Sequence, residues 1–174
     1  MMRHLTPADY TAMPWDNGRG TTVELLRETG PDGGLLLRLS MASVVEDGPF
    51  SIFPGVERNL TVISGPGFDL VGHTRIRAAP LVPVAFAGDV PIAAVGVTAP
   101  SDDFNVMTAR AFPSPDVEVQ ASGDVSPPIG GRLAVFALDV GSVSGCDLGK
   151  HDLLLTHKNA RLTGGPFIVV RLAF

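Results

Sequence analysis

Hydrophobic and polar residues alternate along most of the chain with a period of two, the spacing that puts every second side chain on one face of a β-strand. In residues 35–42 the odd-numbered positions are leucine or methionine, whereas Arg38 lies on the opposite face. Similar runs occupy residues 22–26, 60–64, 68–71, 82–87, 92–97, 104–110, 117–120, 133–140, 152–156 and 167–172. Gly, Pro, Asp or Asn bounds most runs at intervals of about 8–12 residues, which is typical of an all-β sandwich or barrel.

The segment 112–131 has a different composition from its surroundings. It contains four prolines, several small residues and only one short strand candidate. We therefore expect it to connect two halves, 1–111 and 112–174, within one compact unit. A single short helix is expected at 6–10, because Thr6 can cap its start and Pro7 suits its first position.

Composition narrows the class of protein. Of the 174 residues, 45% are hydrophobic and 18% are charged, which excludes an intrinsically disordered chain. The net charge is −5 and no Lys/Arg cluster occurs, so nucleic acid is not an expected partner. No apolar run approaches the roughly 18 residues of a membrane helix, and the N-terminus shows no apolar signal region. We expect a cytoplasmic protein with no membrane partner.

The sequence contains no recognisable metal or nucleophile motif. Cys146 is the only cysteine, which excludes an intrachain disulfide framework and a cysteine-based zinc cluster. The four histidines form no His-x-His pair, and we interpret them as ordinary surface or turn residues. The serine motifs Gly-x-Ser-x-Gly and Ser-x-x-Lys are absent. We predict no metal, no cofactor and no catalytic residue, which favours a binding protein over an enzyme.

The segment 13–25 combines the only tryptophan with a tight-turn dipeptide, Asn17-Gly18. One interpretation is a turn whose Trp15 closes the end of a barrel. The other is the rim of a ligand pocket, in which Trp15 forms an apolar wall and Asn17 donates hydrogen bonds. The sequence leaves both open.

Two arginines and an asparagine stand on otherwise apolar strands. Arg38 lies opposite a leucine face, and Arg58 follows a rigid loop that holds Phe50. Asn105 lies on an apolar strand and must be hydrogen-bonded if it is buried. If the non-leucine face lines a barrel mouth, Arg38 and Arg58 would bind a carboxylate through their planar donor forks. The alternative is an Arg–Asp pair that braces the barrel.

Taken together and in this order, five segments resemble the HutD/Ves family of the cupin superfamily. They are residues 13–22, 37–40, 47–58, 86–89 and 103–108, and the chain from about residue 112 matches more loosely as a second jelly-roll half. The resemblance implies an all-β fold of double-stranded β-helix barrels, a bicupin in a single chain. It also implies an association with bacterial histidine utilisation, through binding of an intermediate such as N-formylglutamate or urocanate.

The resemblance also shows where this chain departs from related proteins. The family element W-x-N-G-x-G-x-T corresponds to Trp15, Asn17, Gly18, Gly20 and Thr22. Asp16 stands where Lys is common, and Arg19 where Gly is common. Cupin enzymes usually hold a metal through a His-x-His motif followed by a glutamate. Glu57 could correspond to that glutamate, but the histidines are absent, which favours a metal-free pocket.

We therefore predict a non-enzymatic protein that binds a small carboxylate and regulates or limits histidine utilisation. Its predicted site residues are Trp15 and Phe50 as apolar walls, Arg38 and Arg58 as anion anchors, and Asn17 and Asn105 as hydrogen-bonding groups.

Two other functions stay open. The first is a metal-independent isomerase or hydrolase of a small organic acid, with Glu57, Asp103 or a histidine as acid or base. The second is an interaction module whose exposed face pairs with itself or a partner. A homodimer is the default expectation for the oligomeric state.

Overall fold

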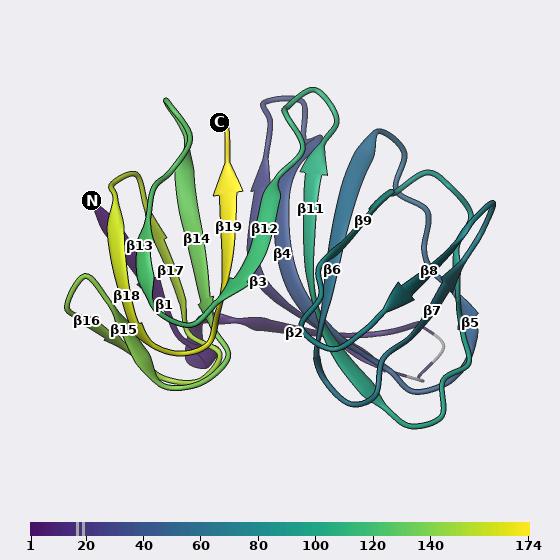
Figure 1. Cartoon of the computed structure of the whole chain (residues 1–174). Helices are drawn as coiled ribbons and strands as arrows, with labels where there is room; N and C mark the ends of the chain where they lie inside the picture. Colours follow the sequence, from purple (N-terminus) through teal and green to yellow (C-terminus); the bar gives the residue numbers. More distant parts are fainter. Residues whose placement is uncertain (17, 19) are drawn as a thin grey trace. The chain divides into compact units, whose positions relative to one another are not determined.

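The computed structural model describes residues 1–16, 18 and 20–174, which form β-strands and one turn of 3-10 helix at Pro7–Asp9. No helix within these residues is both long and apolar enough to cross a membrane. The chain divides into two units, Thr11–Ala111 and the combination of Met1–Tyr10 with Phe112–Phe174. The sequence division placed residues 1–10 in the first half. In the structure they join the second unit, because β1 (Met2–Leu5) pairs with β17 (Leu153–Thr156) (Figure 1).

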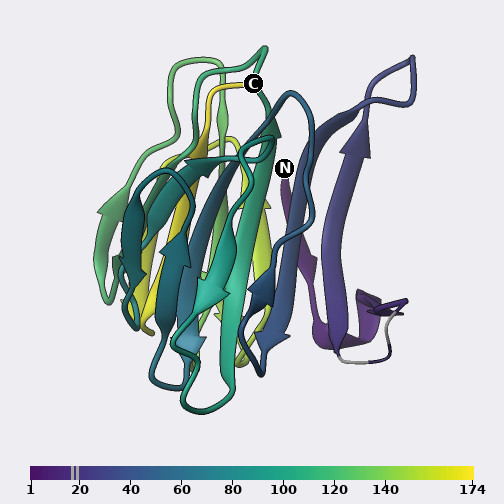
Figure 2. The same cartoon turned by 90° about the vertical axis from the view of Figure 1, so that its right-hand side faces the viewer.

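The unit Thr11–Ala111 is made of two antiparallel sheets. The six-stranded sheet has the order β2 (Thr11–Pro14), β3 (Thr21–Thr29), β4 (Leu35–Val44), β11 (Ser101–Ala109), β6 (Val56–Ser64) and β9 (Val84–Ala87). The four-stranded sheet has the order β5 (Gly48–Pro49), β10 (Ala93–Val95), β7 (Phe68–Val71) and β8 (Arg75–Ala78). Strands β3 and β4 form a long hairpin, drawn in violet and blue in Figure 2.

A hydrophobic core lies between these two sheets. Leu60 and Val62 of β6 pack with Phe68 and Leu70 of β7, and all four side chains are fully buried. The turn from β6 to β7 requires a glycine at Gly65, whose φ is +83° and whose added Cβ would lie 2.3 Å from the Pro100 carbonyl oxygen. Strand alternation therefore directs one face of β6 into the core, and Arg58 lies on this same face.

The second unit repeats the two-sheet arrangement. Its five-stranded sheet has the order β1, β17, β14 (Arg132–Ala137), β19 (Phe167–Leu172) and β12 (Asp116–Gln120). Its four-stranded sheet has the order β13 (Gly123–Val125), β18 (Ala160–Gly164), β15 (Gly141–Val143) and β16 (Cys146–Leu148). Core residues from both sheets pack together, including Val135, Leu154, Leu162 and Phe167.

The all-β prediction is confirmed, but no closed barrel is found among the described residues. In each unit the two sheets remain separate in their hydrogen bonding and are joined by side-chain packing. The sequence predicts strands from alternation, whereas closure depends on whether edge strands pair. The expected short helix at 6–10 is one 3-10 turn, in which the Asp9 carboxylate accepts hydrogen bonds from the backbone N–H and hydroxyl of Thr6.

Candidate functional site

A pocket of about 420 Å³ lies in the unit Thr11–Ala111, on the face of the six-stranded sheet that also carries core residues. Its lining comprises Trp15, Asp16, Thr22, Arg38, Ser40, Ala42, Val44, Pro49, Phe50, Ser51, Phe53, Arg58, Asp103, Asn105 and Met107. Pockets of about 300–1,000 Å³ with a few convergent polar groups are typical of small-molecule sites.

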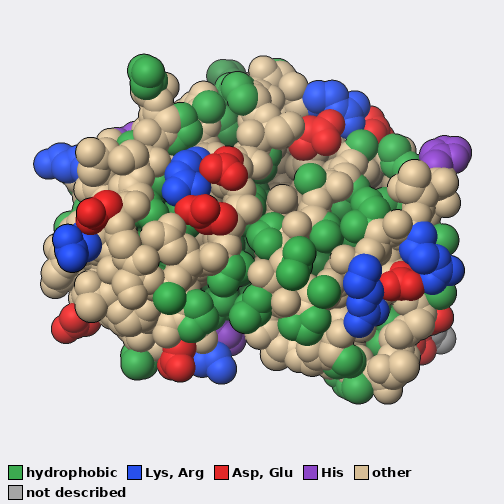
Figure 3. Space-filling model, in the orientation of Figure 1, with side chains coloured by type: hydrophobic (Ala, Val, Ile, Leu, Met, Phe, Trp, Pro, Cys, Tyr) green, Lys and Arg blue, Asp and Glu red, His purple; other side chains and the backbone are tan. Residues whose placement is uncertain are grey.

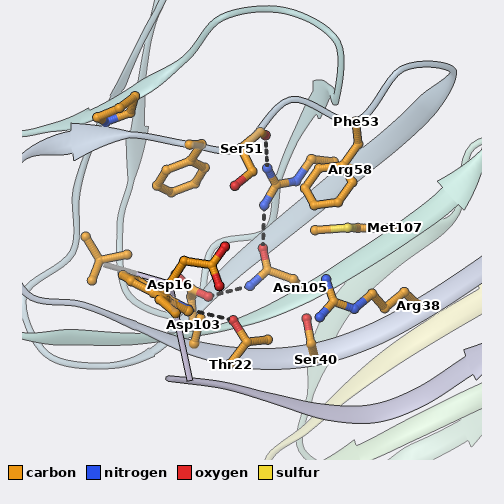
Figure 4. Close-up of a pocket in the computed structure, with 15 residues that line it drawn as sticks. Asp16, Thr22, Arg38, Ser40, Ser51, Phe53, Arg58, Asp103, Asn105 and Met107 are labelled. Atoms are coloured by element: carbon orange, nitrogen blue, oxygen red, sulfur yellow. Dashed lines mark hydrogen bonds between the residues drawn. The ribbon is translucent and has the colours of Figure 1, made fainter. Parts of the chain in front are cut away.

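The register of three central strands brings the polar residues together. Met107 on β11 lies opposite both Arg38 on β4 and Arg58 on β6. Neighbouring strands are roughly 4.8 Å apart, so the backbones of the two arginines are about 10 Å apart. Asp103 and Asn105 precede Met107 at every second position of β11 and therefore share its face. The two predicted anion anchors thus reach one pocket (Figure 4).

The Arg58 guanidinium is buried among aromatic rings. Arg58 is only 8% exposed, and its guanidinium carbon lies 5.3, 5.4 and 5.0 Å from the ring centroids of Phe50, Phe53 and Phe86. Burial lowers the pKa of Arg58 to about 10, although the negative charge of Asp103 opposes this effect. Arg58 therefore remains a cation at neutral pH.

Within the described part of the chain, Arg58 donates its hydrogen bonds to neutral oxygens. Its Nη1 donates to the Ser51 carbonyl at 3.4 Å, and its Nη2 donates to Asn105 Oδ1 at 3.3 Å (Figure 4). Its buried Nε has no hydrogen-bond partner, and no carboxylate of the described residues pairs with it. A buried charge is costly unless it is paired. Arg58 thus presents to the pocket a positive charge that has no direct ion pair with a described carboxylate, and Asp103 acts on it only from beyond Asn105.

Asn105 connects Arg58 to a buried carboxyl group. The Asn105 Nδ2 donates to Asp103 Oδ1 through a short hydrogen bond, while its Oδ1 accepts from Arg58. Asn105 is buried in the structure and is hydrogen-bonded, as expected of an asparagine in that position. Asp103 is 1% exposed, and burial raises its pKa to about 7 against the lowering effects of Asn105 and Arg58.

Arg38 differs from Arg58 because it already has a partner. Its Nε donates to Glu24 Oε2 at 2.7 Å, and Glu24 lies on the adjacent strand β3. Its Nη2 contacts the Met13 sulfur at 3.8 Å. The structure therefore brings both predicted anchors to the pocket but pairs one of them with the Glu24 carboxylate, which also accepts a hydrogen bond from Arg27 at 3.1 Å.

The loop before β3 places Trp15 at the pocket. Trp15 Nε1 donates to Thr22 Oγ1 at 2.9 Å, and its backbone N–H donates to the Gly20 carbonyl at 2.8 Å. An added Cβ on Gly20 would lie 2.8 Å from the indole ring, so the ring packs directly on the glycine. The predicted hydrogen-bonding residue Asn17 lies outside the described residues.

Five of the six predicted site residues thus line the pocket, and sequence reasoning missed several others. Ser40 could have been found, because it follows Arg38 at the next position of the same face. Phe53, which lies in the same segment before β6 as Phe50, contacts Arg58. Glu57, the residue compared with the cupin glutamate, does not line the pocket, and it accepts a hydrogen bond from Arg110 at 2.5 Å.

The second unit contains a separate group of titratable residues. His4 Nε2 lies 2.8 Å from Asp152 Oδ2, and His4 Nδ1 lies 3.9 Å from the Cys146 sulfur. Sequence reasoning did not connect these residues, because their strands are far apart along the chain. No group of three or more His, Cys, Asp or Glu residues in the described part of the chain is arranged to hold a metal ion.

Charged side chains of the first unit outside the pocket form local pairs. Asp69 accepts from Arg75 and Arg77, and Arg110 is paired with Asp89 at 2.8 Å. Basic side chains lie beside acidic ones in several groups on the face drawn in Figure 3. The described residues on this face form no continuous basic surface.

The HutD family matches residues 7–165 of this chain. An uncharacterised 21.2 kDa protein from the hutC 3′ region of Pseudomonas putida is 36% identical over 108 residues, which are 60% of this chain and 57% of that protein. Protein Ves of Citrobacter koseri is 36% identical over 111 residues, which are 59% of this chain and 56% of that protein. The matches span little more than half the length of these relatives.

Solved structures resemble the chain over almost its full length. HutD from Pseudomonas fluorescens SBW25, in a formate condition, has a TM-score of 0.86 and 30% identity, covering 99% of this chain and 98% of that one. The protein PA5104 of Pseudomonas aeruginosa PAO1 has a TM-score of 0.81 and 28% identity, covering 98% and 96%. The nickel(II) complex of the Escherichia coli pirin YhhW has a TM-score of 0.69 at 7% identity, covering 99% of each chain, which shows similarity of fold alone.

Proposed function

Since the chain belongs to the HutD family, we propose that it binds a small organic carboxylate in the pocket around Arg58 and regulates histidine utilisation without catalysing a reaction. The origin of the Pseudomonas putida relative, in the hutC 3′ region, supports the pathway. N-formylglutamate and urocanate are the proposed ligands, because both are small carboxylates of that pathway. We also propose that the two units are cupin-like halves of a bicupin, which the fold similarity to pirin YhhW supports.

One observation carries the proposed ligand chemistry. Arg58 is a buried cation that opens into a cavity, and none of the described carboxylates pairs with it. An arginine in this position suits a carboxylate, because its planar fork can donate two parallel hydrogen bonds. The aromatic rings around it exclude water, which strengthens an ion pair formed inside the pocket.

Arg38 and Asn105 have supporting roles in this proposal. Arg38 is held by Glu24, so it offers its remaining donors without contributing a full net charge. Asn105 holds Arg58 through its oxygen and holds Asp103 through its nitrogen. The pocket as a whole is therefore suited to one carboxylate at Arg58, with the rest of the ligand against Trp15 and Phe50.

Isothermal titration calorimetry with N-formylglutamate, urocanate and formate tests this proposal. We expect at least one acid to bind and its carboxamide analogue not to bind. Arg58→Met should weaken binding by at least about tenfold, because a hydrogen bond to a charged group contributes about 1.5–3 kcal/mol. The matched control is Arg75→Met, which removes the same charge from the surface of the same unit and should bind normally. No binding by any of these acids would refute the proposal.

A second function is favoured by the state of Asp103. A buried carboxyl group with a pKa of about 7 beside a pocket has the properties of a general acid or base. Under this alternative the protein would be a metal-independent isomerase or hydrolase. Incubating the pathway acids with the metal-stripped protein and analysing the products by NMR distinguishes the two functions. Turnover that is lost in Asp103→Asn would support the enzyme.

A further inference from the structure

Asp103 is a buried carboxyl group on the pocket face of β11, and the proposed function does not yet use it. It is 1% exposed and lines the same cavity as Arg58 (Figure 4). Its Oδ1 accepts the short hydrogen bond from Asn105. No other described residue forms a hydrogen bond with it, so Oδ2 is left for a molecule in the pocket.

The orientation of Asn105 sets which protonation state this site can use. The Asn105 oxygen faces the Arg58 donor, so its amide nitrogen must face Asp103. Asp103 Oδ1 is therefore an acceptor whether or not the carboxyl group is ionised. A proton on Asp103 would have to reside on Oδ2, where it could be donated to a ligand.

The charges around the pocket make an ionised Asp103 unfavourable once an anion is bound. The charged residue of β6 that lines the pocket is Arg58, which would be paired with the ligand carboxylate. The charged residue of β4 that lines it is Arg38, which is already paired with Glu24 of β3. The loop residue Asp16 also lines the pocket and adds a negative charge. On β11 itself, Asp102 bonds with serines on the opposite face and raises the pKa of Asp103 further.

We propose that Asp103 binds the ligand as a neutral carboxylic acid, donating a hydrogen bond from Oδ2 to the carboxylate held by Arg58, so that binding of the anion is coupled to uptake of a proton. This rests on the proposed function and makes Asp103 a specificity-determining residue of the same site. Two carboxylates in one buried site cannot both be ionised without a large electrostatic cost. The proton removes that repulsion and adds a donor opposite Arg58.

The coupling has a definite dependence on pH. Burial raises the pKa of Asp103 to about 7, so the free protein is partly protonated at neutral pH. Below that pH the ligand binds without taking up a proton. Above pH 7 the protein must take up one proton from solution for each anion that it binds. The affinity should therefore fall by about tenfold for each further pH unit. The pKa of Arg58 is about 10, so Arg58 does not titrate in this range.

Calorimetry of the wild-type chain with N-formylglutamate and with formate tests the coupling. Neither acid titrates between pH 6 and 8.5, so any proton exchange belongs to the protein. Titrations at pH 8 in two buffers of different ionisation enthalpy give the number of protons taken up directly. We expect a value approaching one at pH 8, falling toward zero at pH 6.

Two variants distinguish the effect of Asp103 on proton uptake from that of its neighbour Asp102. Asp103→Asn keeps the size of the side chain, and its amide nitrogen can still donate a hydrogen bond to the ligand. This variant should bind the ligand without proton uptake, and its affinity should no longer change with pH. Asp102→Asn, on the opposite face of the same strand, should keep the uptake. Binding by the wild-type protein without proton uptake would overturn this inference alone. An absence of binding by N-formylglutamate, formate and urocanate at every pH would overturn the proposed function, and this inference with it.

Discussion

Replacing Arg58 by methionine should stabilise the protein while abolishing its ligand site. Methionine keeps a long, flexible side chain that can contact the rings of Phe50, Phe53 and Phe86, but it removes the buried charge. Residues at functional sites often lower the stability of the folded protein, so their replacement can raise it. If Arg58 instead served to stabilise the fold, Arg58→Met would lower the free energy of unfolding.

The magnitude follows from the burial of the guanidinium. Burial lowers the pKa of Arg58 from its ordinary value to about 10, a shift of between two and three pKa units. Each pKa unit corresponds to about 1.4 kcal/mol, so the charged form costs the folded state roughly 3 kcal/mol. Because the folded pKa is below the unfolded one, this cost is fully present at every pH well below 10. The three lost cation–π contacts offset part of the gain, at about 0.5–1 kcal/mol each, and leave a net stabilisation of about 0–1.5 kcal/mol.

Urea unfolding at pH 7 without ligand measures this difference, and thermal unfolding should show a rise in Tm of up to about 6 °C. The contrast variant is Arg38→Met, which removes the shorter of the two arginine contacts of Glu24, at 2.7 Å, and leaves Arg27, at 3.1 Å, as its remaining partner. It should destabilise the protein, because the more exposed Arg27 only partly replaces the buried charge of Arg38 beside Glu24. If Arg58→Met loses more than about 1 kcal/mol, the view of Arg58 as an unpaired, costly cation is wrong.

Three further predictions concern single residues. Gly20→Ala should destabilise the protein by about 1–3 kcal/mol, as measured by thermal unfolding, because the added methyl group would collide with the Trp15 ring. The stability of Asp103→Asn relative to the wild type should increase as the pH rises from 4 to 8. Burial raises the pKa of Asp103 to about 7. The stability that the protonated carboxyl group gives the wild type is therefore complete below the unfolded pKa of 3.8 and is lost as the pH rises through 7. Equal pH profiles of unfolding free energy would contradict this. His4→Ala should cost about 1 kcal/mol in urea unfolding, because Asp152 loses a hydrogen bond at 2.8 Å, and an unchanged midpoint would show that the pair contributes nothing.

Much of the fold could be predicted from alternation, and the missed strands have identifiable causes. The runs at 35–42 and 104–110 correspond to Leu35–Val44 and Ser101–Ala109, whose hydrophobic face made the period visible. Strand Thr11–Pro14 is exposed at every residue, so it leaves no such pattern. Strand Gly141–Val143 has only three residues, too few to establish a period.

The candidate site could be predicted as a set of residues but not as an arrangement. The sequence by itself determined that charged or polar residues stand on apolar strands, since Arg38, Arg58 and Asn105 interrupt hydrophobic runs. Buried polar groups need partners, so each of them predicted a contact whose identity was unknown.

Tertiary structure alone decided which contacts are made, because a one-residue change in strand register turns every side chain to the other face. The observed register aligns Arg38 and Arg58 on either side of Met107. It then gives Arg38 a carboxylate from the neighbouring strand and leaves Arg58 among aromatic rings without one. The sequence alone does not distinguish the two arginines. Only their surroundings in the folded chain give Arg38 a carboxylate partner and leave Arg58 available to pair with a ligand anion.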